Sequence, residues 1–513
     1  MEYVHGSHAG EQLGPGVQVW IGGRDFRLSE LLGEGSFGAV WSATSPGLNC
    51  EVAIKEIICR SEVELGRAAT EQQLLKFVGR GLVDNPGLKE DSPAAVAAKR
   101  FPSLVASEVK ALGPDLWQVR LAMTRLAGKP LESLLETANE GTRPTADGSL
   151  VETCRCVRSL LDQLVPALEH LGTQALHRDI TTRNILVDKT GQNYSFGLVD
   201  FGLAVDVVKW KADLLTHDIG GDGHYWPTSS WFVLEYGAHH LESYPALLQE
   251  YEADLDVHAL GVIALRCLME LWAPEAMVAE AKSKSSPPSW AQTAKLMRLR
   301  MAWTNFWDDI ARFWQPIFDA FACGGCDALE QLKSLYAQAG VHHMVSADLC
   351  AVRAALRELR DVAELNDLRV ICDALLLLMR PGKKRDDKPT WRRIRAVLRG
   401  ERSASRAPSP AVKEVAEEGH PQSRQQFLVG KELPAKTEHG SSQGRNRRDL
   451  CDALKTELRG WPSSGVPAAS VAASQSTYSP SGPAQGSMWS SASVSSHCGS
   501  ATVGKPISYL HVS

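Results

Sequence analysis

The most informative stretch of this 513-residue chain is "ALHRDITTRNILVD", residues Ala175 to Asp188. Its Asp179 is followed five positions later by Asn184, and the run "NILVD" that starts at this asparagine is typical of a strand. A carboxylate and an amide oxygen at this spacing suit a catalytic base beside a metal ligand. The structural alternative for Asp179 is a turn or helix-cap role.

The bulk composition is that of an ordinary globular protein. Hydrophobic residues make up 44% and charged residues 22% of the sequence, and its length predicts more than one region. The net charge of −5 argues against nucleic acid as a partner. The first ten residues lack the pattern of a signal peptide, and the apolar stretch "HALGVIALRCLMELW" is interrupted by Arg266. Because the eleven cysteines are scattered and odd in number, we expect reduced thiols in a cytoplasmic or nuclear protein without a membrane span.

The chain divides into a β-rich beginning, a helical middle and a low-complexity end. Strand patterns in "FRLSELLGEGSFGAVWSA", "CEVAIKEII", "SLVASEV" and "WQVRLAM" accompany one helical pattern, "RAATEQQLLKFV". The Gly/Pro/Ala-rich stretch Gly79–Pro102 is interpreted as a surface insertion. Long helical patterns dominate from Val151 to Arg399. Residues 401–513 are rich in Ser, Ala, Pro and Gly and are predicted to be disordered, except for one helical pattern around Leu454.

Two further motifs suit the binding of phosphate. "GEGSFGAV" carries Gly33, Gly35 and Gly38, which let the backbone fold tightly over phosphate oxygens, although a plain hairpin would also explain them. A β-prone segment follows instead of a helix, and no Lys-Ser/Thr follows the last glycine, which excludes a Rossmann fingerprint and a P-loop. The next strand ends in "VAIK", so Lys55 is expected to meet the α- and β-phosphates of a nucleotide.

Together with "DFG" at residues 200–202, these motifs occur in the order found in eukaryotic protein kinases, and the sequence resembles that family from about Phe26 to Arg399. The resemblance implies an α+β, bilobal fold, with a small antiparallel sheet and one key helix followed by a larger, mainly helical lobe. The expected boundaries are an N-terminal extension at 1–25, a kinase domain at 26–400 and a disordered tail at 401–513, with lobes at about 26–123 and 129–400, a hinge at 124–128 and a helical insertion at 272–378.

The resemblance further implies that ATP and Mg²⁺ are the cofactors and that a protein hydroxyl accepts the phosphate. Asp179 resembles the base that accepts the hydroxyl proton, a role that does not require a raised pKa. Asn184 and Asp200 resemble the Mg²⁺ ligands. In the same pattern, Asp256 and Gly261 match the buried helix that anchors the loop containing Asp179.

Lys55 needs a carboxylate that holds it toward the phosphates. The family pattern favours Glu71, while Glu62 and Glu64 are alternatives close to the end of the strand. Met123 resembles the gatekeeper, although simple core packing also explains it. The expected nucleotide-binding residues are Gly33, Glu34, Gly35, Ser36, Phe37, Gly38, Val40, Ala53, Lys55, Glu71, Met123, and Thr124 to Leu126 in the hinge.

The sequence departs from the family pattern near the acceptor. Thr181 stands where serine/threonine kinases usually have a lysine, and Arg183 stands where tyrosine kinases often have an arginine, so a positive charge is retained. We therefore count Arg183 with Asp179 and Lys55 as catalytic candidates. No Ala-Pro-Glu motif follows "DFG"; Glu235 is a possible replacement for its glutamate. The arginine that normally pairs with that glutamate is replaced by Lys388, with Arg385 nearby.

Two regions have open interpretations. The insertion carries several tryptophans, which at helical spacing favour core packing over a docking surface for a regulatory partner. The tail is a second place where such a partner could bind. Arg178 is found in kinases whose activation segment is ordered by phosphorylation, and a segment held by its own aromatic residues is the equal alternative. Candidate phosphorylation sites are Thr216, Tyr225, Thr228 and Ser229.

Three functions fit these patterns. The leading prediction is an active ATP-dependent protein kinase, with Ser/Thr as the default acceptor and Tyr not excluded. A pseudokinase or ATP-binding scaffold that acts through the insertion and the tail is the second, favoured by the altered acceptor region. A small-molecule kinase ranks last, because such enzymes tend to lack the triple-glycine loop and differ at the position of Arg178.

Overall fold

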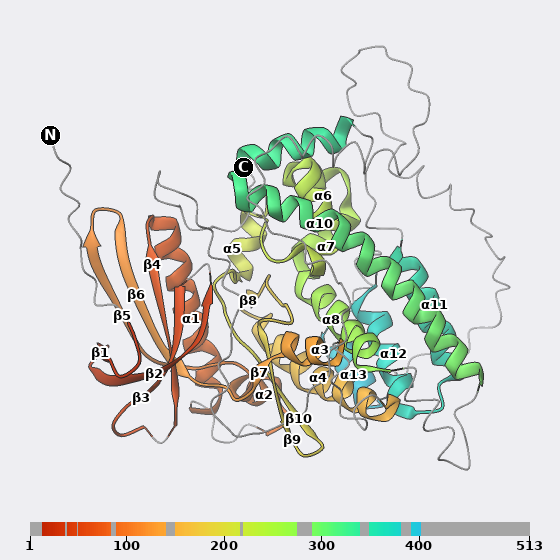
Figure 1. Cartoon of the computed structure of the whole chain (residues 1–513), viewed down its shortest axis with the longest axis horizontal. Helices are drawn as coiled ribbons and strands as arrows, with labels where there is room; N and C mark the ends of the chain where they lie inside the picture. The colour runs from red at the N-terminus through yellow and green to blue at the C-terminus, as the bar shows by residue number, and fades with distance from the viewer. Residues whose placement is uncertain are drawn as a thin grey trace, which may run out of the picture. The chain divides into compact units, whose positions relative to one another are not determined.

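The computed structural model describes residues 13–35, 38–48, 50–83, 89–139, 149–215, 219–273, 290–338, 348–380 and 391–401. Apart from Glu401, the predicted disordered tail and its helical pattern lie outside these residues. The expected α+β arrangement is confirmed, because an antiparallel sheet at the start of the chain is followed by a mainly helical region (Figure 1).

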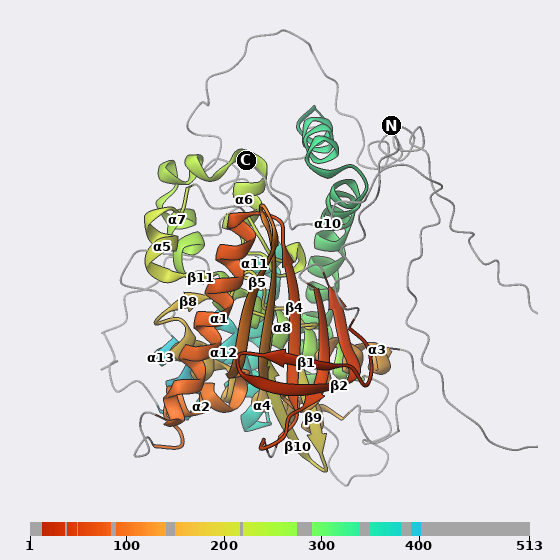
Figure 2. The same ribbon diagram turned by 90° about the vertical axis from the view of Figure 1, so that its left-hand side faces the viewer.

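Six antiparallel strands form the sheet of the first lobe, in the order β1-β2-β3-β4-β6-β5 (Figure 2). Strand β1 precedes Phe26, the expected start of the lobe, and pairs with β2, so the sheet begins earlier than predicted. Phe26, Ile54 and Ala122 are fully buried on one face of the sheet. The strands are β1 (Gln18–Ile21), β2 (Arg24–Gly35), β3 (Gly38–Thr44), β4 (Val52–Cys59), β5 (Leu104–Gly113) and β6 (Leu116–Thr124).

Helix α1 (Glu62–Val83) packs against β4, β5 and β6. Its Leu74, Leu75 and Val78 are buried, and their three- and four-residue spacing places them on the face that also carries Glu71. Because this apolar face packs against the sheet, the Glu71 carboxylate on the same face is also buried there.

The stretch Gly79–Pro102 is not simply a surface insertion, which corrects the prediction. Part of it forms α2 (Pro93–Arg100), which packs against α1 and α4 with Ala95 and Ala97 buried, and Phe101 beyond it is fully buried. Alanines give little hydrophobic signal in the sequence, yet their small side chains allow close contact between helices.

The second lobe is built around α4 (Leu150–Leu171), α8 (Leu255–Leu271) and α12 (Asn366–Leu378), which pack against one another (Figure 1). Gly261 lets α8 approach α12, since a Cβ at this position would lie 2.9 Å from the Leu378 Cβ. Helix α12 is thus part of the core of the lobe, although the predicted insertion extended through Leu378.

The remaining elements surround this core. Helices α10 and α11 pack against each other, and α10 also contacts the short 3₁₀ helix η1. In the part of the chain that the structure describes, no helix has the length and apolarity needed to cross a membrane. The other elements are β7 (Lys129–Pro130), β8 (Ala175–Leu176), β9 (Ile185–Thr190), β10 (Asn193–Leu198), β11 (Val205–Asp206), α3 (Leu131–Asn139), α5 (Val207–Ala212), η1 (Gly223–Tyr225), α6 (Thr228–Tyr236), η2 (Ala238–Ser243), α7 (Pro245–Ala253), α10 (Trp290–Gln338), α11 (Asp348–Val362) and α13 (Trp391–Leu398).

Candidate active site

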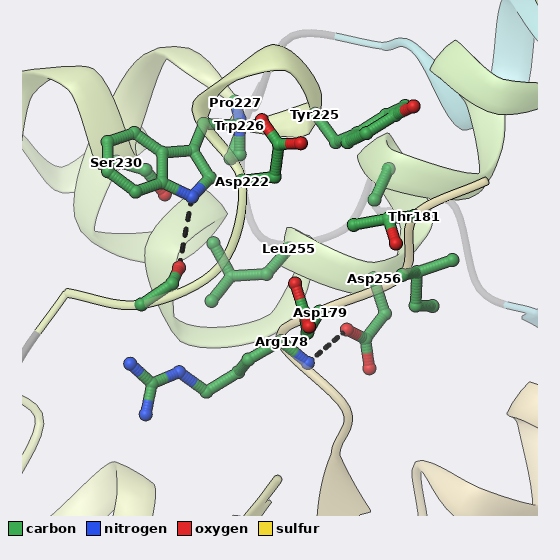
Figure 3. A pocket seen from close by; sticks show the side chains of 13 residues that line it. Arg178, Asp179, Thr181, Asp222, Tyr225, Trp226, Pro227, Ser230, Leu255 and Asp256 are labelled. Atoms are coloured by element: carbon green, nitrogen blue, oxygen red, sulfur yellow. Dashed lines mark hydrogen bonds between the residues drawn. The ribbon is translucent and has the colours of Figure 1, made fainter. Parts of the chain in front are cut away.

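The loop between β8 and β9 is fixed by a carboxylate from α8. Asp256 accepts hydrogen bonds from the backbone N–H groups of His177 (2.7 Å) and Arg178 (2.9 Å), the second of which is drawn in Figure 3. These bonds help to hold Arg178 at a φ of 64°, a conformation that few residues other than glycine adopt. The prediction that Asp256 anchors this loop is confirmed.

Asp179 lies at a small pocket between this loop and the segment 220–230 (Figure 3). The Asn184 side-chain amide donates to the Asp179 carboxylate (2.8 Å) and to its backbone carbonyl (2.9 Å). Burial, together with the negative charges of Asp200 and Asp222, raises the pKa of Asp179 to about 7, although the Asn184 bond and the Arg183 charge oppose this. The role expected from the sequence does not require this shift, and no sequence pattern places Asp222 beside Asp179.

Lys55 joins the two lobes through two carboxylates. Its ammonium group donates to Glu71 of α1 (2.8 and 3.0 Å) and to Asp200 (2.7 Å), and both Lys55 and Glu71 are almost fully buried. Burial alone would lower the pKa of Lys55, but attraction to Asp200 and Glu71 outweighs it and raises the pKa above its ordinary value. Of the three glutamates considered from the sequence, Glu71 is the one that the structure pairs with Lys55.

The pKa of Asp200 is shifted by the same ion pair. Burial favours its neutral form, but Lys55 outweighs burial and holds the pKa of Asp200 below its usual value. Its backbone has a φ of 69°, in the left-handed region that Asp adopts more readily than most residues. The next residue, Phe201, is buried against His177, with ring centroids 5.3 Å apart.

The residues present fit a Mg²⁺ ion. Among the described residues, no hydrogen bond reaches the side-chain oxygen of Asn184 or the second carboxylate oxygen of Asp200. Both atoms are hard oxygen donors, the type that Mg²⁺ prefers. No cluster of three His, Cys, Asp or Glu side chains suited to a metal occurs in the described part of the chain. Phosphate oxygens and water would therefore supply the remaining ligands.

The segment joining the lobes offers one backbone donor among its three predicted residues. The N–H of Thr124 is bonded to the Ser103 carbonyl (2.9 Å), and that of Arg125 to the Glu51 carbonyl (3.2 Å). The N–H of Leu126 makes no hydrogen bond within the described residues. Of these three N–H groups, that of Leu126 is therefore the one open to a ligand within the described residues.

Other predicted nucleotide-binding residues lie on the sheet. Val40 of β3 is opposite Lys55, and Ala53 of β4 is opposite Met123, whose side chain is largely buried. Gly38 is required sterically, because a Cβ there would lie 1.8 Å from the Glu56 carbonyl oxygen. Gly33, Glu34 and Gly35 belong to β2 and pair with β3, whereas Ser36 and Phe37 lie outside the described residues.

Arg183 is held by a residue that the sequence analysis missed. Its guanidinium donates to Asp222 (3.0 Å), and Asp222 also accepts bonds from the His224 backbone N–H (3.0 Å) and pairs with the His224 ring (2.7 Å). Burial would raise the pKa of Asp222, but the His224 and Arg183 interactions outweigh it and lower the pKa. No pattern in the sequence links Asp222 to Arg183, because they come from different loops.

The region expected to hold the acceptor contains a buried carboxylate that no sequence motif indicates. Glu235 is exposed on α6, and Lys388 and Arg385 lie outside the described residues. The buried carboxylate is instead Glu250 of α7, which accepts a hydrogen bond from the Ser229 N–H (2.8 Å) at the start of α6. Burial raises the pKa of Glu250 to about 7.

The candidate phosphorylation sites differ in accessibility. Tyr225 and Ser229 are buried, and Thr228 is half-buried, whereas Thr216 lies outside the described residues. The Arg178 guanidinium lies over the Trp210 ring, 4.7 Å from its centroid. Because the side chains of Tyr225 and Ser229 are buried, phosphorylation of either residue would require its side chain to leave the protein interior.

A polar network beneath the catalytic loop was also missed. Arg266 of α8 donates to both carboxylate oxygens of Glu132 (each 3.0 Å), to the Thr182 hydroxyl (3.1 Å) and to the Tyr225 hydroxyl (2.9 Å). In the sequence, Arg266 indicated only that an apolar stretch was not a membrane span. Its partners come from three other elements, so only the fold identifies its role.

Parts of the chain are similar in sequence to known serine/threonine-protein kinases. No protein-family model matches the chain. It is 25% identical over 218 residues to a serine/threonine-protein kinase of Kluyveromyces lactis, covering 40% of this chain and 31% of that protein. It is 26% identical over 251 residues to serine/threonine-protein kinase pakH of Dictyostelium discoideum, covering 48% and 38%. For serine/threonine-protein kinase PknA of Mycobacterium tuberculosis the identity is 27% over 193 residues, covering 37% and 38%.

The chain thus spans less than two fifths of the length of each of these relatives. A sheet lobe with a buried lysine, joined to a helical lobe that carries the Asp179 loop, is the bilobal fold of protein kinases. With these matches, the chain is a divergent protein-kinase-like protein.

Proposed function

We propose that this chain is an ATP-dependent protein kinase that transfers the γ-phosphate of ATP to a protein hydroxyl, on Ser or Thr by default and with Tyr not excluded. The observation that carries the proposal is the convergence of Lys55, Glu71 and Asp200 beside the pair of Asp179 and Asn184. These five side chains come from four separate segments of the chain, because Asp179 and Asn184 share one loop, and each is of the type that this reaction uses.

In this mechanism the protein mainly positions groups and stabilises charge. Lys55, oriented by Glu71, binds the α- and β-phosphates. Asn184 and Asp200 hold Mg²⁺, which when bound neutralises charge on the phosphates. The Asp179 carboxylate accepts the proton of the attacking hydroxyl, and Arg183, held by Asp222, supplies positive charge where Thr181 replaces the usual lysine. With a pKa of about 7, Asp179 can accept this proton readily near neutral pH.

The test is transfer of label from γ-labelled ATP to dephosphorylated casein and to a Glu/Tyr copolymer, followed by phosphoamino-acid analysis. Removal of divalent metal with EDTA is expected to stop the transfer, and excess Mg²⁺ is expected to restore it, because the described residues offer two open oxygen ligands, on Asn184 and Asp200, too few to hold the ion against a chelator. An Asp179→Asn chain prepared identically controls for contaminating kinases.

A pseudokinase is the second candidate, favoured by the altered sequence pattern of the acceptor region, where no Ala-Pro-Glu motif follows "DFG". For this function, Mg·ATP would raise the melting temperature while no label was transferred to any acceptor. Equal transfer by the wild-type chain and the Asp179→Asn chain would contradict the kinase proposal.

A further inference from the structure

We propose that helix α10 is a built-in support for the acceptor-facing loop, residues 220–231, and that its Trp307 and Trp314 are positioning residues for phosphoryl transfer. The inference rests on the proposed function and deepens it. It assigns to the tryptophans of the predicted insertion a contribution to catalysis that does not require phosphorylation of this loop.

Trp314 makes the tightest contact. Its ring lies against Trp226 (centroids 4.9 Å apart) and Trp231 (6.1 Å), on either side of the Pro227 turn. Gly223 faces the same ring so closely that a Cβ would lie 2.4 Å from Trp314 Cε3. The backbone of Gly223 is not in the left-handed region, so the neighbouring ring, rather than the conformation, requires glycine here.

Trp307, two turns earlier on α10, supports the other side of the loop. Its ring lies 5.2 Å from the His224 ring and 6.0 Å from the Tyr225 ring. The Arg266 guanidinium lies over it, 4.9 Å from the ring centroid. The two tryptophans therefore contact consecutive residues of η1 and the turn that follows it.

Residues of η1 and its N-terminal end are hydrogen-bonded to the catalytic loop. The Tyr225 hydroxyl is bonded to the Thr182 hydroxyl (2.8 Å) and to Arg266 (2.9 Å), and Asp222 at the start of η1 holds Arg183 (3.0 Å). Thr182 and Arg183 follow Asp179 closely in sequence. A shift of η1 away from α10 would thus move the Arg183 guanidinium, which is bonded to Asp222. It would also move Thr182, which is bonded to Tyr225 and lies in the same loop as Asp179.

The loop also has aromatic contacts of its own, since Trp226 and Trp231 lie 5.3 Å apart. Trp314 nevertheless contacts both rings and also covers Gly223. Helix α10 therefore adds packing contacts to Trp226, Trp231 and Gly223 that the loop does not make by itself. Buried Tyr225 and Ser229 offer no accessible hydroxyl for a modifying kinase.

The experiment uses the full chain with Gly223→Ala, whose added methyl group cannot fit against Trp314. We expect at least a tenfold fall in kcat/KM for dephosphorylated casein, an unchanged KM for Mg·ATP, and faster hydrogen exchange at the backbone amides of residues 220–231. The double variant Gly223→Ala/Trp314→Phe, which removes the fused ring at the clash, should recover most of both losses. Gly113→Ala, at a glycine with open space around it, is the matched control.

A merely structural role would lower the melting temperature and raise both KM values alike, and the smaller ring would bring no recovery. Wild-type exchange and transfer by Gly223→Ala would overturn the proposal, as would loss of transfer after phosphatase treatment of the wild-type chain. If the wild-type chain transfers no phosphate at all, the proposed function fails, whereas the exchange measurement still decides whether α10 holds the loop.

Discussion

Replacement of Lys55 by methionine is expected to reduce phosphoryl transfer by about a hundredfold or more and to destabilise the fold by about 3–5 kcal/mol. The lysine is 4% exposed and lies between two carboxylates, Glu71 and Asp200. Methionine fills a similar volume but leaves these carboxylates without their cation. Because an unpaired buried charge costs more than the pair contributes, the loss should exceed that of any surface charge.

The measurement is the thermal unfolding midpoint of the Lys55→Met chain at pH 5 and pH 7.5. Burial already raises the pKa of Glu71, even with Lys55 present. Without the lysine, folded-state pKa values of both carboxylates rise above their unfolded values, so stability falls as pH rises and the deficit is larger at pH 7.5. Lys76→Met, at an exposed lysine on α1, the helix that carries Glu71, is the matched control. A deficit independent of pH would contradict this account.

Replacement of Asp179 by asparagine is expected to have opposite effects on activity and stability. Transfer should fall by about 10²–10⁴-fold, because the proton-accepting carboxylate is lost. Stability above pH 7 should increase, by on the order of 4 kcal/mol if the whole difference between the folded pKa of about 7 and the ordinary value of 3.8 contributes. Asparagine keeps an oxygen that can accept the hydrogen bond from Asn184.

The sign follows from the raised pKa. Below about pH 4 the Asp179 carboxyl is protonated in both states and costs nothing. Between that pH and about 7 it ionises in the unfolded chain first, so the wild type loses stability relative to the variant, and above 7 the difference is constant. Unfolding midpoints of both chains from pH 4.5 to 8 provide the measurement, with Asp115→Asn at an exposed turn as control. A wild type more stable than the variant at pH 8 would sink the prediction.

The sequence was sufficient where short motifs determine local chemistry. The order of the glycine loop, "VAIK", "HRDITTRN" and "DFG" predicted the sheet lobe, the helical lobe and the role of Asp256 in anchoring the catalytic loop. The same pattern selected Glu71 among three glutamates, and the apolar spacing of α1 places that residue at Lys55. The functional roles of these residues, and the limits of the domain, remain predictions.

The sequence was insufficient where small or polar residues act through distant partners. Ala95 and Ala97 carry no hydrophobic signal in the sequence, so the pattern around α2 predicts a surface insertion rather than a packed helix. Glu250 carries no motif, and its role at the start of α6 depends on the packing of α7. Asp222 is separated from Arg183 by 39 positions, and its neighbourhood in the sequence indicates only a glycine-rich turn.

The amino-acid sequence by itself therefore determined the class of fold and the identities of the candidate catalytic groups, because those are encoded in residues at fixed local spacing. The tertiary structure alone decided their electrostatic state and their support. Burial beside Asp200 and Asp222 sets the pKa of Asp179, and the rings of Trp307 and Trp314 reach η1 only after α10 folds back onto it. Burial and charge act through space, over distances that no spacing along the chain records.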